Sequence, residues 1–255
     1  MRMSFMCSAF LMFAAPSLCP AGTIPEPGLN GRAGPAFTTE YKVLADASSW
    51  AAALKSYGLG PDEKEREIYF YDTPSLALYK RGLVLRSRAG KKKADSTVKM
   101  RPAPSYIPAA VSSDGGFKCE YDRTPLNSVY SCSLTGDEPV GDAAAVASGT
   151  AKPKKLFNGL QESWAGDVWT GLVSLGPVRS YSWEVSHPVF GTLAFERWDL
   201  AGGPSFFEIS FRVNAGADGT EAKIQALHRE LAVRGIKLAG DQSSKTAAAM
   251  SFFSK

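Results

Sequence analysis

The amino-acid sequence predicts a mainly antiparallel α+β domain whose strands close into a barrel with helices packed outside. Strand-like runs follow one another without the regular strand–helix alternation of a parallel sheet. In most of these runs a charged residue recurs two positions from another polar residue, so both lie on one face of the strand. Large apolar residues occupy the intervening positions, where outer helices can cover them. A closed barrel with charges inside satisfies these observations together.

The N-terminus predicts a secretory signal peptide. Arg2 precedes an apolar run over residues 5–15, and small residues follow near Ala21. This run is too short to span a membrane. We therefore expect a signal peptide over residues 1–21, a Gly- and Pro-rich flexible linker over 22–35 and one domain over 36–255. The protein would be secreted or periplasmic, with a retained N-terminal membrane anchor as the alternative.

Composition limits the classes of partner. Hydrophobic residues make up 44% of the 255 residues, which is enough for a large core and excludes global disorder. The net charge is only +4, so nucleic acid is not expected as a partner. No later segment is apolar enough to span a membrane. Anion binding would have to come from the local placement of charges.

The elements begin with a strand over 37–44 and a helix over 50–57. Asp46 and two following serines can cap this helix, and Gly58 ends it. Strands over 68–71 and 83–88 then flank Asp72-Thr73-Pro74, where proline stops the first strand and the Asp and Thr side chains can cap the next turn of the chain. The remaining predicted strands are 96–101, 116–123, 128–134, 176–185, 193–200 and 205–213. The remaining predicted helices are 143–147, 156–164, 220–233 and 245–253.

Two cysteines remain after removal of the signal peptide. Cys119 and Cys132 lie almost symmetrically about the turn at 124–127, in two consecutive strands. In an oxidising compartment this arrangement favours a cross-strand disulfide over two buried thiols.

The charged pairs on the strands have a definite chemistry. Basic residues dominate the middle strands, and carboxylates mark the first and late strands. Arginine and lysine hold phosphate oxygens, whereas carboxylates hold Mg²⁺ or Mn²⁺. This residue set could hydrolyse a polyphosphate without a Cys, Ser or His nucleophile. The alternative is an ordinary sheet with one hydrated outer face.

Several motifs resemble the CYTH family, also called triphosphate tunnel metalloenzymes. The most specific is YFYDTPSLALYKRGLVLRSR over 69–88. It is followed by VKMRP, KCEYD, AFERWDL, FFEIS and SSKT, so the resemblance covers about residues 37–250. It implies an eight-stranded antiparallel tunnel that hydrolyses a triphosphate or polyphosphate with Mg²⁺ or Mn²⁺. The expected partner is a small phosphate-chain molecule.

The resemblance also implies roles for individual residues, with Lys42 helping to orient the attacking water. The expected metal ligands are Glu40, Glu120, Glu196 and Glu208. The expected phosphate-binding residues are Lys42, Arg86, Arg88, Lys99, Arg101, Lys118, Arg179 and Lys245.

Two departures from the family pattern change the expected chemistry. Thr38 and Ser210 stand where the family has metal-binding glutamates. Their loss removes two negative charges from the metal site, while the basic residues are kept. The alternative function is therefore a non-catalytic module of the same fold that binds polyphosphate or another polyanion. A third alternative, a barrel with an apolar interior that binds lipid, is disfavoured by the charged pairs.

Overall fold

The computed structural model describes residues 38–60, 64–214 and 216–255, which belong to one compact unit, Gly34–Lys255. The predicted signal peptide and linker lie outside the described residues. In the described part of the chain, no helix is long and apolar enough to cross a membrane.

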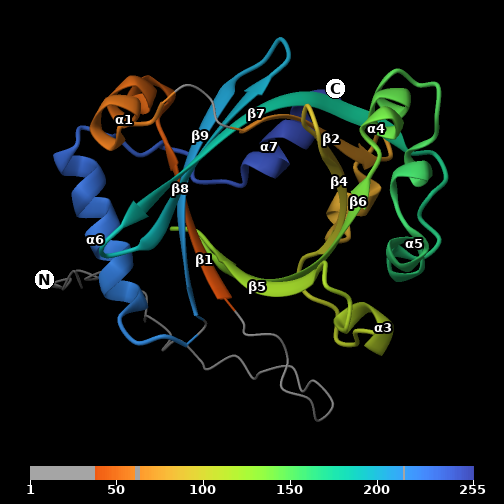
Figure 1. The fold of residues 1–255 in the computed structure, drawn as a ribbon, viewed down its shortest axis with the longest axis horizontal. Helices are drawn as coiled ribbons and strands as arrows, with labels where there is room; N and C mark the ends of the chain where they lie inside the picture. Colours follow the sequence, from red (N-terminus) through yellow and green to blue (C-terminus); the bar gives the residue numbers. More distant parts are fainter. Residues whose placement is uncertain (1–37, 61–63, 215) are drawn as a thin grey trace, which may run out of the picture. The chain divides into compact units, whose positions relative to one another are not determined.

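Strands form a closed barrel in the order β1-β5-β6-β4-β3-β2-β7-β8-β9 (Figure 1). Their bounds are β1 Thr38–Ala45, β2 Lys64–Asp72, β3 Leu83–Ala89, β4 Ala94–Met100, β5 Phe117–Arg123, β6 Ser128–Glu138, β7 Val173–His187, β8 Gly191–Leu200 and β9 Ser205–Asn214. The predicted barrel is confirmed, but it has nine strands rather than eight and is not wholly antiparallel. Strands β1 and β5 pair in parallel. A ring with an odd number of strands cannot alternate direction throughout, so at least one neighbouring pair must be parallel.

The helices are mostly short and connect strands. Their bounds are α1 Trp50–Tyr57, α2 Ala77–Lys80, α3 Ala109–Ser112, α4 Val140–Ala147, α5 Gly159–Ala165, α6 Thr220–Val233 and α7 Lys245–Phe253. Short 3₁₀ segments lie at Ala47–Ser49 and Pro153–Leu156. The predicted helices over 50–57 and 245–253 are confirmed, and Gly58 ends α1 with a left-handed conformation. Helix α3 falls in a stretch without helical periodicity and was not predicted.

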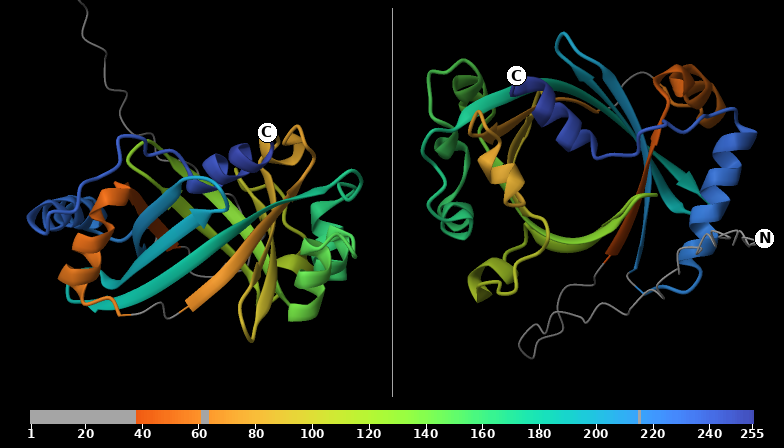
Figure 2. Two further views of the ribbon diagram at one scale, coloured as in Figure 1. Left: turned by 90° about the horizontal axis from the view of Figure 1, so that it is seen from above. Right: turned by 180° about the vertical axis from the view of Figure 1, so that it is seen from behind.

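Two apolar clusters hold helices against the outside of the barrel, where Figure 2 shows these helices lying around the ring of strands. Tyr41 and Phe211 pack on one side with Leu227 of α6, while α1 contributes Ala53 to the same cluster. On the other side a second cluster joins strands β3 to β6 to α3, α4 and α5, including Trp164. These contacts cover the apolar face of each strand and leave the charged face to the interior.

Helix α7 differs from the other helices because it covers part of the barrel interior. Its Ala249 and Met250 pack on Phe70, Val178 and Trp198. Phe70 lies opposite Arg86 in the β2–β3 pair, which places it on the interior face. Figure 1 shows α7 crossing the opening of the ring. The expectation that all helices pack outside is therefore wrong for α7, and one part of the interior is apolar.

The turn after β2 confirms the predicted capping. The Asp72 carboxylate is fully buried and accepts hydrogen bonds from Leu78 N at 2.9 Å and Tyr79 N at 2.8 Å. Thr73 Oγ1 accepts from Ala77 N at 3.0 Å. These bonds satisfy the first amides of α2 and position it at one end of the barrel.

Gly82 fixes the distance between β3 and the end of β4. Its φ is +82°, and a Cβ atom there would lie 2.1 Å from the Arg101 carbonyl oxygen. The Arg101 amide donates to the Gly82 carbonyl at 2.7 Å. A side chain at this position would push Arg101 away from the interior.

The predicted disulfide between Cys119 and Cys132 is present and buried. It joins opposite residues of β5 and β6 on the outer face of the wall. The neighbouring residues Glu120 and Ser131 therefore face the interior directly behind it.

We expect replacement of Cys119 and Cys132 by serine to lower the free energy of unfolding by about 3 kcal/mol. The disulfide joins residues 13 positions apart and so restricts the unfolded chain, and the variant loses this restriction. Urea titration of the oxidised protein and the double variant measures this difference. Replacement of the outer residue Thr39 by serine is the control. Equal stabilities of the oxidised protein and the double variant would contradict the expectation.

Candidate functional site

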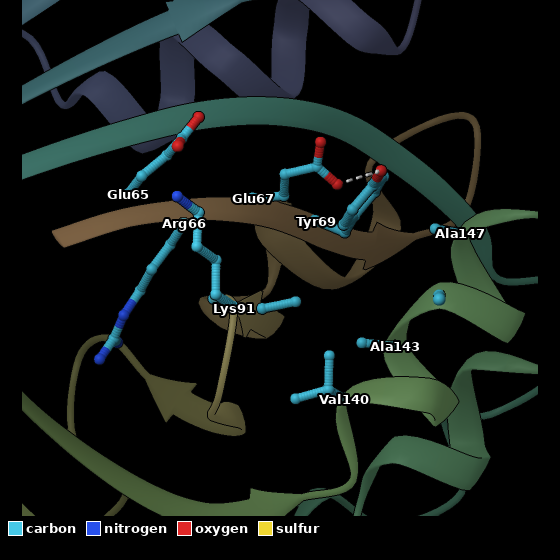
Figure 3. A pocket seen from close by; sticks show the side chains of 11 residues that line it. Glu65, Arg66, Glu67, Tyr69, Lys91, Val140, Ala143 and Ala147 are labelled. Carbon is cyan, nitrogen blue, oxygen red and sulfur yellow. Dashed lines mark hydrogen bonds between the residues drawn. The ribbon is translucent and has the colours of Figure 1, made fainter.

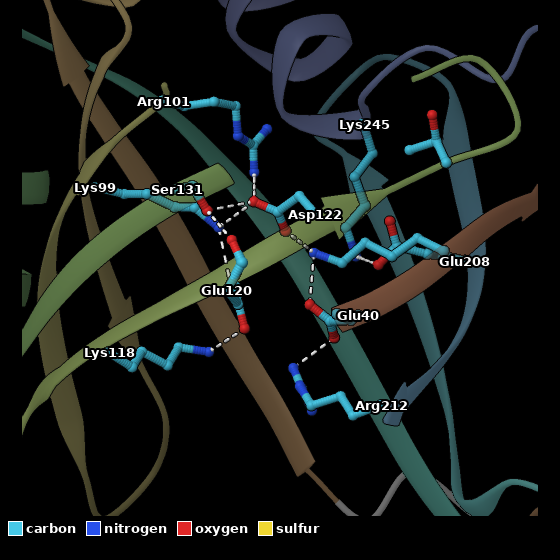
Figure 4. A network of polar contacts seen from close by, with 12 residues as sticks. Glu40, Lys99, Arg101, Lys118, Glu120, Asp122, Ser131, Glu208, Arg212 and Lys245 are labelled. Carbon is cyan, nitrogen blue, oxygen red and sulfur yellow. Dashed lines mark hydrogen bonds and ion pairs between the residues drawn. The ribbon is translucent and has the colours of Figure 1, made fainter. Parts of the chain in front are cut away.

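The interior face of the barrel carries charged residues from most of its strands, and Figure 4 shows those that form its central network. The strand register places charged residues next to one another on neighbouring strands. Glu40 of β1 lies opposite Asp122 of β5 on one side and Arg212 of β9 on the other. Likewise Glu196 lies opposite Glu208, and Arg88 lies opposite Asp95. Because opposite residues of paired strands point to the same face, the predicted alternation gathers these charges in one place.

Three carboxylates form the centre of the site. One oxygen from each of Glu40, Glu120 and Asp122 lies within 4.8 Å of the others. The exposed fractions of these residues are only 5%, 4% and 5%. Three hard oxygen donors at this spacing suit Mg²⁺ or Mn²⁺.

Lysines and arginines hold the three carboxylates. Lys42 Nζ lies 2.7 Å from Glu40 Oε2 and 2.8 Å from Asp122 Oδ1. Lys99 Nζ lies 2.7 Å from Asp122 Oδ2 and 3.3 Å from Glu120 Oε1. The remaining partners are Arg101 on Asp122, Lys118 on Glu120, Arg212 on Glu40 and the Ser131 hydroxyl, which donates to Asp122.

These contacts determine the protonation of the cluster. Burial alone would raise the pKa of Glu120, but the charges of Lys99 and Lys118 outweigh it and lower that pKa to about 2. The pKa values of Glu40 and Asp122 are also lowered, against burial, by their basic partners. Burial opposes the charge of Lys42, yet the surrounding carboxylates raise its pKa. All three carboxylates and Lys42 are therefore charged at neutral pH.

A second charged group lies at the start of α7. Lys245 Nζ forms ion pairs with Glu196 and with Glu208, the latter at 2.9 Å. It also lies 4.4 Å from the centre of the Trp198 ring. Ser180 Oγ and Trp198 Nε1 each donate to Glu196 at 2.8 Å. The lysine thus ties α7 to the late strands.

A third group lies on β2, β3 and β4. Arg88 and Arg66 both form ion pairs with Asp95, at 2.8 and 3.2 Å. Arg86 differs, because its Nε is buried without a hydrogen-bond partner and its Nη2 makes only a 3.5 Å contact to Thr97. Among the described residues no carboxylate forms an ion pair with Arg86. Burial and the neighbouring Arg88 lower its pKa to about 10, which still leaves it charged at neutral pH.

One predicted site residue is placed elsewhere. Arg179 is exposed and lies opposite Glu67 and Asp199, on the outer face of β7. Its neighbour Ser180 is the residue that faces the interior. A shift of one residue along a strand reverses the face, so the predicted phosphate-binding role of Arg179 does not fit its position.

Several interior residues were not predicted as site residues. Asp122 follows Glu120 by two positions on β5, so the alternation that identified Glu120 could also have identified it. Arg66, Asp95 and Arg212 follow the same rule on their strands. Ser131 could not have been found in this way, because serine in a strand carries no comparable signal.

The two departures from the family pattern also face the interior. Thr38 lies opposite Glu120, and Ser210 lies opposite Lys42. Both are therefore next to the charged centre, where a glutamate would have added a carboxylate. Because hydroxyl groups are uncharged, the basic side chains around the centre outnumber the carboxylates there.

A separate cavity of about 270 Å³ lies on the outer face, between β2 and α4 (Figure 3). Its lining includes Glu67, Tyr69, Val140, Ala143 and Ala147. The alanines of α4 make one wall apolar, and Tyr69 donates a long 3.4 Å hydrogen bond to Glu67. It contains none of the three central carboxylates, so the interior remains the candidate site.

Acid should destabilise the folded protein through the central carboxylates. The folded-state pKa of Glu120, about 2, lies below the ordinary value of 4.5. Its stabilising contribution is therefore complete above about pH 4.5 and is lost as pH falls toward 2. We expect Glu120→Gln to reduce the slope of unfolding free energy against pH in this window, as measured by urea titration. The exposed Glu184→Gln is the control, and an unchanged slope in Glu120→Gln would contradict the assignment.

Comparison with solved structures identifies the fold. An adenylyl cyclase homologue from Hippeastrum, HpAC1, described as having a dominant triphosphatase activity, superposes with a TM-score of 0.58 at 16% identity. The alignment covers 85% of this chain and 96% of that one. A protein from Bacillus halodurans assigned as an adenylate cyclase gives 0.56 at 15% identity, with coverage of 83% and 96%.

Comparison of the sequence alone assigns the chain to no protein family. No protein-family model matches the chain. No curated protein matches it either. The similarity is therefore one of structure, and the chain has the barrel fold of these two solved structures.

Proposed function

We propose that this protein hydrolyses a phosphoric anhydride bond of a triphosphate or polyphosphate inside the barrel, with a divalent metal. The observation that carries the proposal is the interior itself. It combines three clustered carboxylates with an excess of basic side chains, including Arg86, whose buried Nε has no hydrogen-bond partner among the described residues. A polyanion would supply the negative charge that this interior lacks. The triphosphatase activity described for the Hippeastrum structure supports the same reaction class.

The donor set fits a hard divalent cation. Glu40, Glu120 and Asp122 would hold it through carboxylate oxygens, and Lys42 and Lys99 would have to release some of their present ion pairs. A bound Mg²⁺ or Mn²⁺ would neutralise phosphate charge and lower the barrier to attack at phosphorus. Glu196 and Glu208 are held by Lys245 and form a separate pair, so we assign the metal to the three central carboxylates first.

The protein's own side chains would bind and orient the phosphate chain. Arg86 would donate from its guanidinium group, and Lys99 and Arg101 lie close enough to the carboxylates to contact phosphates held there. Water would add to the terminal phosphorus and pass a proton to a phosphate oxygen, the bridging P–O bond would break, and its electrons would remain on the departing phosphate. Lys42 stays protonated because its pKa is raised, so it would stabilise negative charge rather than accept a proton.

A second function, binding of a polyanion without hydrolysis, is favoured by Thr38 and Ser210. These residues remove two carboxylates from the centre, and every remaining one is held by a lysine or arginine. If residues 1–21 direct the chain outside the cytoplasm, as we propose from the sequence, inorganic polyphosphate is a more accessible ligand than a nucleotide.

Phosphate release from tripolyphosphate and ATP, with and without Mn²⁺, tests hydrolysis directly. We expect Mn²⁺-dependent release, and Arg86→Leu should lower kcat/KM roughly 100- to 1000-fold because a preorganised cation is lost. Arg179→Leu is the matched control, since Arg179 lies on the outer face and should leave kcat/KM unchanged. Equal losses in both variants would contradict the assigned site.

Restoring the two carboxylates separates the two functions. For the hydrolase, Thr38→Glu with Ser210→Glu should lower the Mn²⁺ concentration for half-maximal phosphate release, roughly tenfold or more. The control is Thr39→Glu, on the opposite face of the same strand. Phosphate release seen only in the double variant, from an inert parent that still binds tripolyphosphate, would favour the binding module.

A further inference from the structure

Strand β6 presents small, uncharged side chains to the barrel interior between two charged neighbours. These side chains are Val129, Ser131, Ser133 and Thr135. Ser131 lies opposite Glu120 of β5, and Ser133 lies opposite Lys99 of β4. Because the side chains of β6 are short at these positions, longer side chains from β4 have room to cross the strand.

Lys99 makes such a crossing. It belongs to β4, yet its Nζ lies 2.7 Å from Asp122 Oδ2 and 3.3 Å from Glu120 Oε1, on the far side of β6. Arg101, the residue after β4, also reaches Asp122. A large side chain on the interior face of β6 would stand in the path of both. The serines therefore allow β4 to contact the central carboxylates.

Ser131 also bonds to one of these carboxylates. It is fully buried, and its Oγ lies 2.7 Å from Asp122 Oδ2 and 3.4 Å from the Glu120 carbonyl oxygen. A hydroxyl group has a single proton, so we assign its donation to Asp122, at the shorter distance. The backbone is held in place as well, because the next residue, Cys132, forms the disulfide with Cys119. The hydroxyl is thus preorganised toward Asp122.

The other side chains that bind Asp122 in the described part of the chain are all charged. They are Lys42 on Oδ1, at 2.8 Å, and Lys99 and Arg101 on Oδ2. A divalent cation at Asp122 would repel these side chains, and the two lysines would have to withdraw to admit it. A neutral hydroxyl is not repelled in this way. Ser131 is therefore the partner that can keep its bond to Asp122 while a cation is bound.

This bond also determines which oxygen of Asp122 is left for a cation. Lys42 Nζ lies 2.7 Å from Glu40 Oε2 and 2.8 Å from Asp122 Oδ1, so Oδ1 is directed toward Glu40. Oδ2 is directed toward Ser131. A carboxylate held at Oδ2 cannot turn freely, and Oδ1 then stays directed toward Glu40, where the three central carboxylates meet.

We propose that Ser131 is a positioning residue of the metal site, whose hydroxyl holds Asp122 Oδ2 so that Oδ1 stays available to a divalent cation. A hydrogen bond to a metal ligand orients that ligand, and loss of such a bond commonly weakens metal affinity about 10- to 100-fold. The inference rests on the proposed function for the position of the metal. It does not require that a phosphate chain be bound or hydrolysed.

Titration of Mn²⁺ alone into the disulfide-bonded protein, followed by calorimetry, tests the role without a substrate. We expect Ser131→Ala to weaken Mn²⁺ binding roughly 10- to 100-fold. Ser133→Ala is the matched control, because Ser133 is another buried interior serine of β6 and its hydroxyl has no hydrogen-bond partner among the described residues. Ser131→Thr keeps the hydroxyl and should bind Mn²⁺ nearly as tightly as the parent. Urea titration checks that each variant is folded.

Phosphate release gives a second measurement. Ser131→Ala should need a correspondingly higher Mn²⁺ concentration for half-maximal release, with kcat at saturating Mn²⁺ close to that of the parent. A variant that had lost the structure of the interior would instead lose kcat at every Mn²⁺ concentration, and this result would contradict a positioning role.

The outcomes separate this role from the metal assignment itself. Equal Mn²⁺ affinity in the parent and Ser131→Ala overturns the positioning role and leaves the metal site intact. Equal weakening in Ser131→Ala and Ser133→Ala also overturns it, since the cause would then be packing along β6. Weakening in Ser131→Thr as large as in Ser131→Ala has the same meaning. A parent that binds no Mn²⁺ overturns both this inference and the metal-dependent function.

Discussion

The balance of charge inside a closed wall is the constraint on which the rest of the structure depends. Strand alternation directs every second side chain into the barrel, and charged side chains there leave bulk water. Most of these charges pair with an opposite charge inside. The pairs that Lys42 makes with Glu40 and Asp122 are the central example, since Lys42 of β1 binds one carboxylate on its own strand and one on β5.

Such pairs are weak support for stability, because desolvation offsets much of the attraction between the partners. An apolar interior of similar volume would hold the strands together as well, and the barrel does use one where α7 packs on Phe70 and Trp198. Removing the charged interior side chains from water therefore costs free energy that the fold itself does not require. Such charged interiors are typical of binding sites. Arg86 is the clearest case, because its buried Nε has no partner in the described part of the chain.

Much of the site was predictable from sequence, because the alternation of side chains along a strand shows which residues share a face once the position of the strand is known. This alternation placed Glu40, Lys99 and Glu208 on the interior face without knowledge of which strands are neighbours. The family resemblance, and not alternation, assigned Arg179 to the interior, and an error of one residue within a long strand reverses the face. The contacts of Lys245 with Glu196 and the apolar packing of α7 were beyond prediction, because they depend on how the last helix returns over the barrel. Closure with nine strands also depends on pairing between distant segments, which no local pattern determines.

A crystal structure of the protein with tripolyphosphate and Mn²⁺ would show whether the charged interior binds the phosphate chain. We expect phosphorus atoms inside the barrel, with a phosphate oxygen within hydrogen-bond distance of the Arg86 guanidinium group and Mn²⁺ bound by Glu40, Glu120 and Asp122. Tripolyphosphate bound only on the outer surface, with the interior ion pairs of Lys42 unchanged, would contradict this expectation.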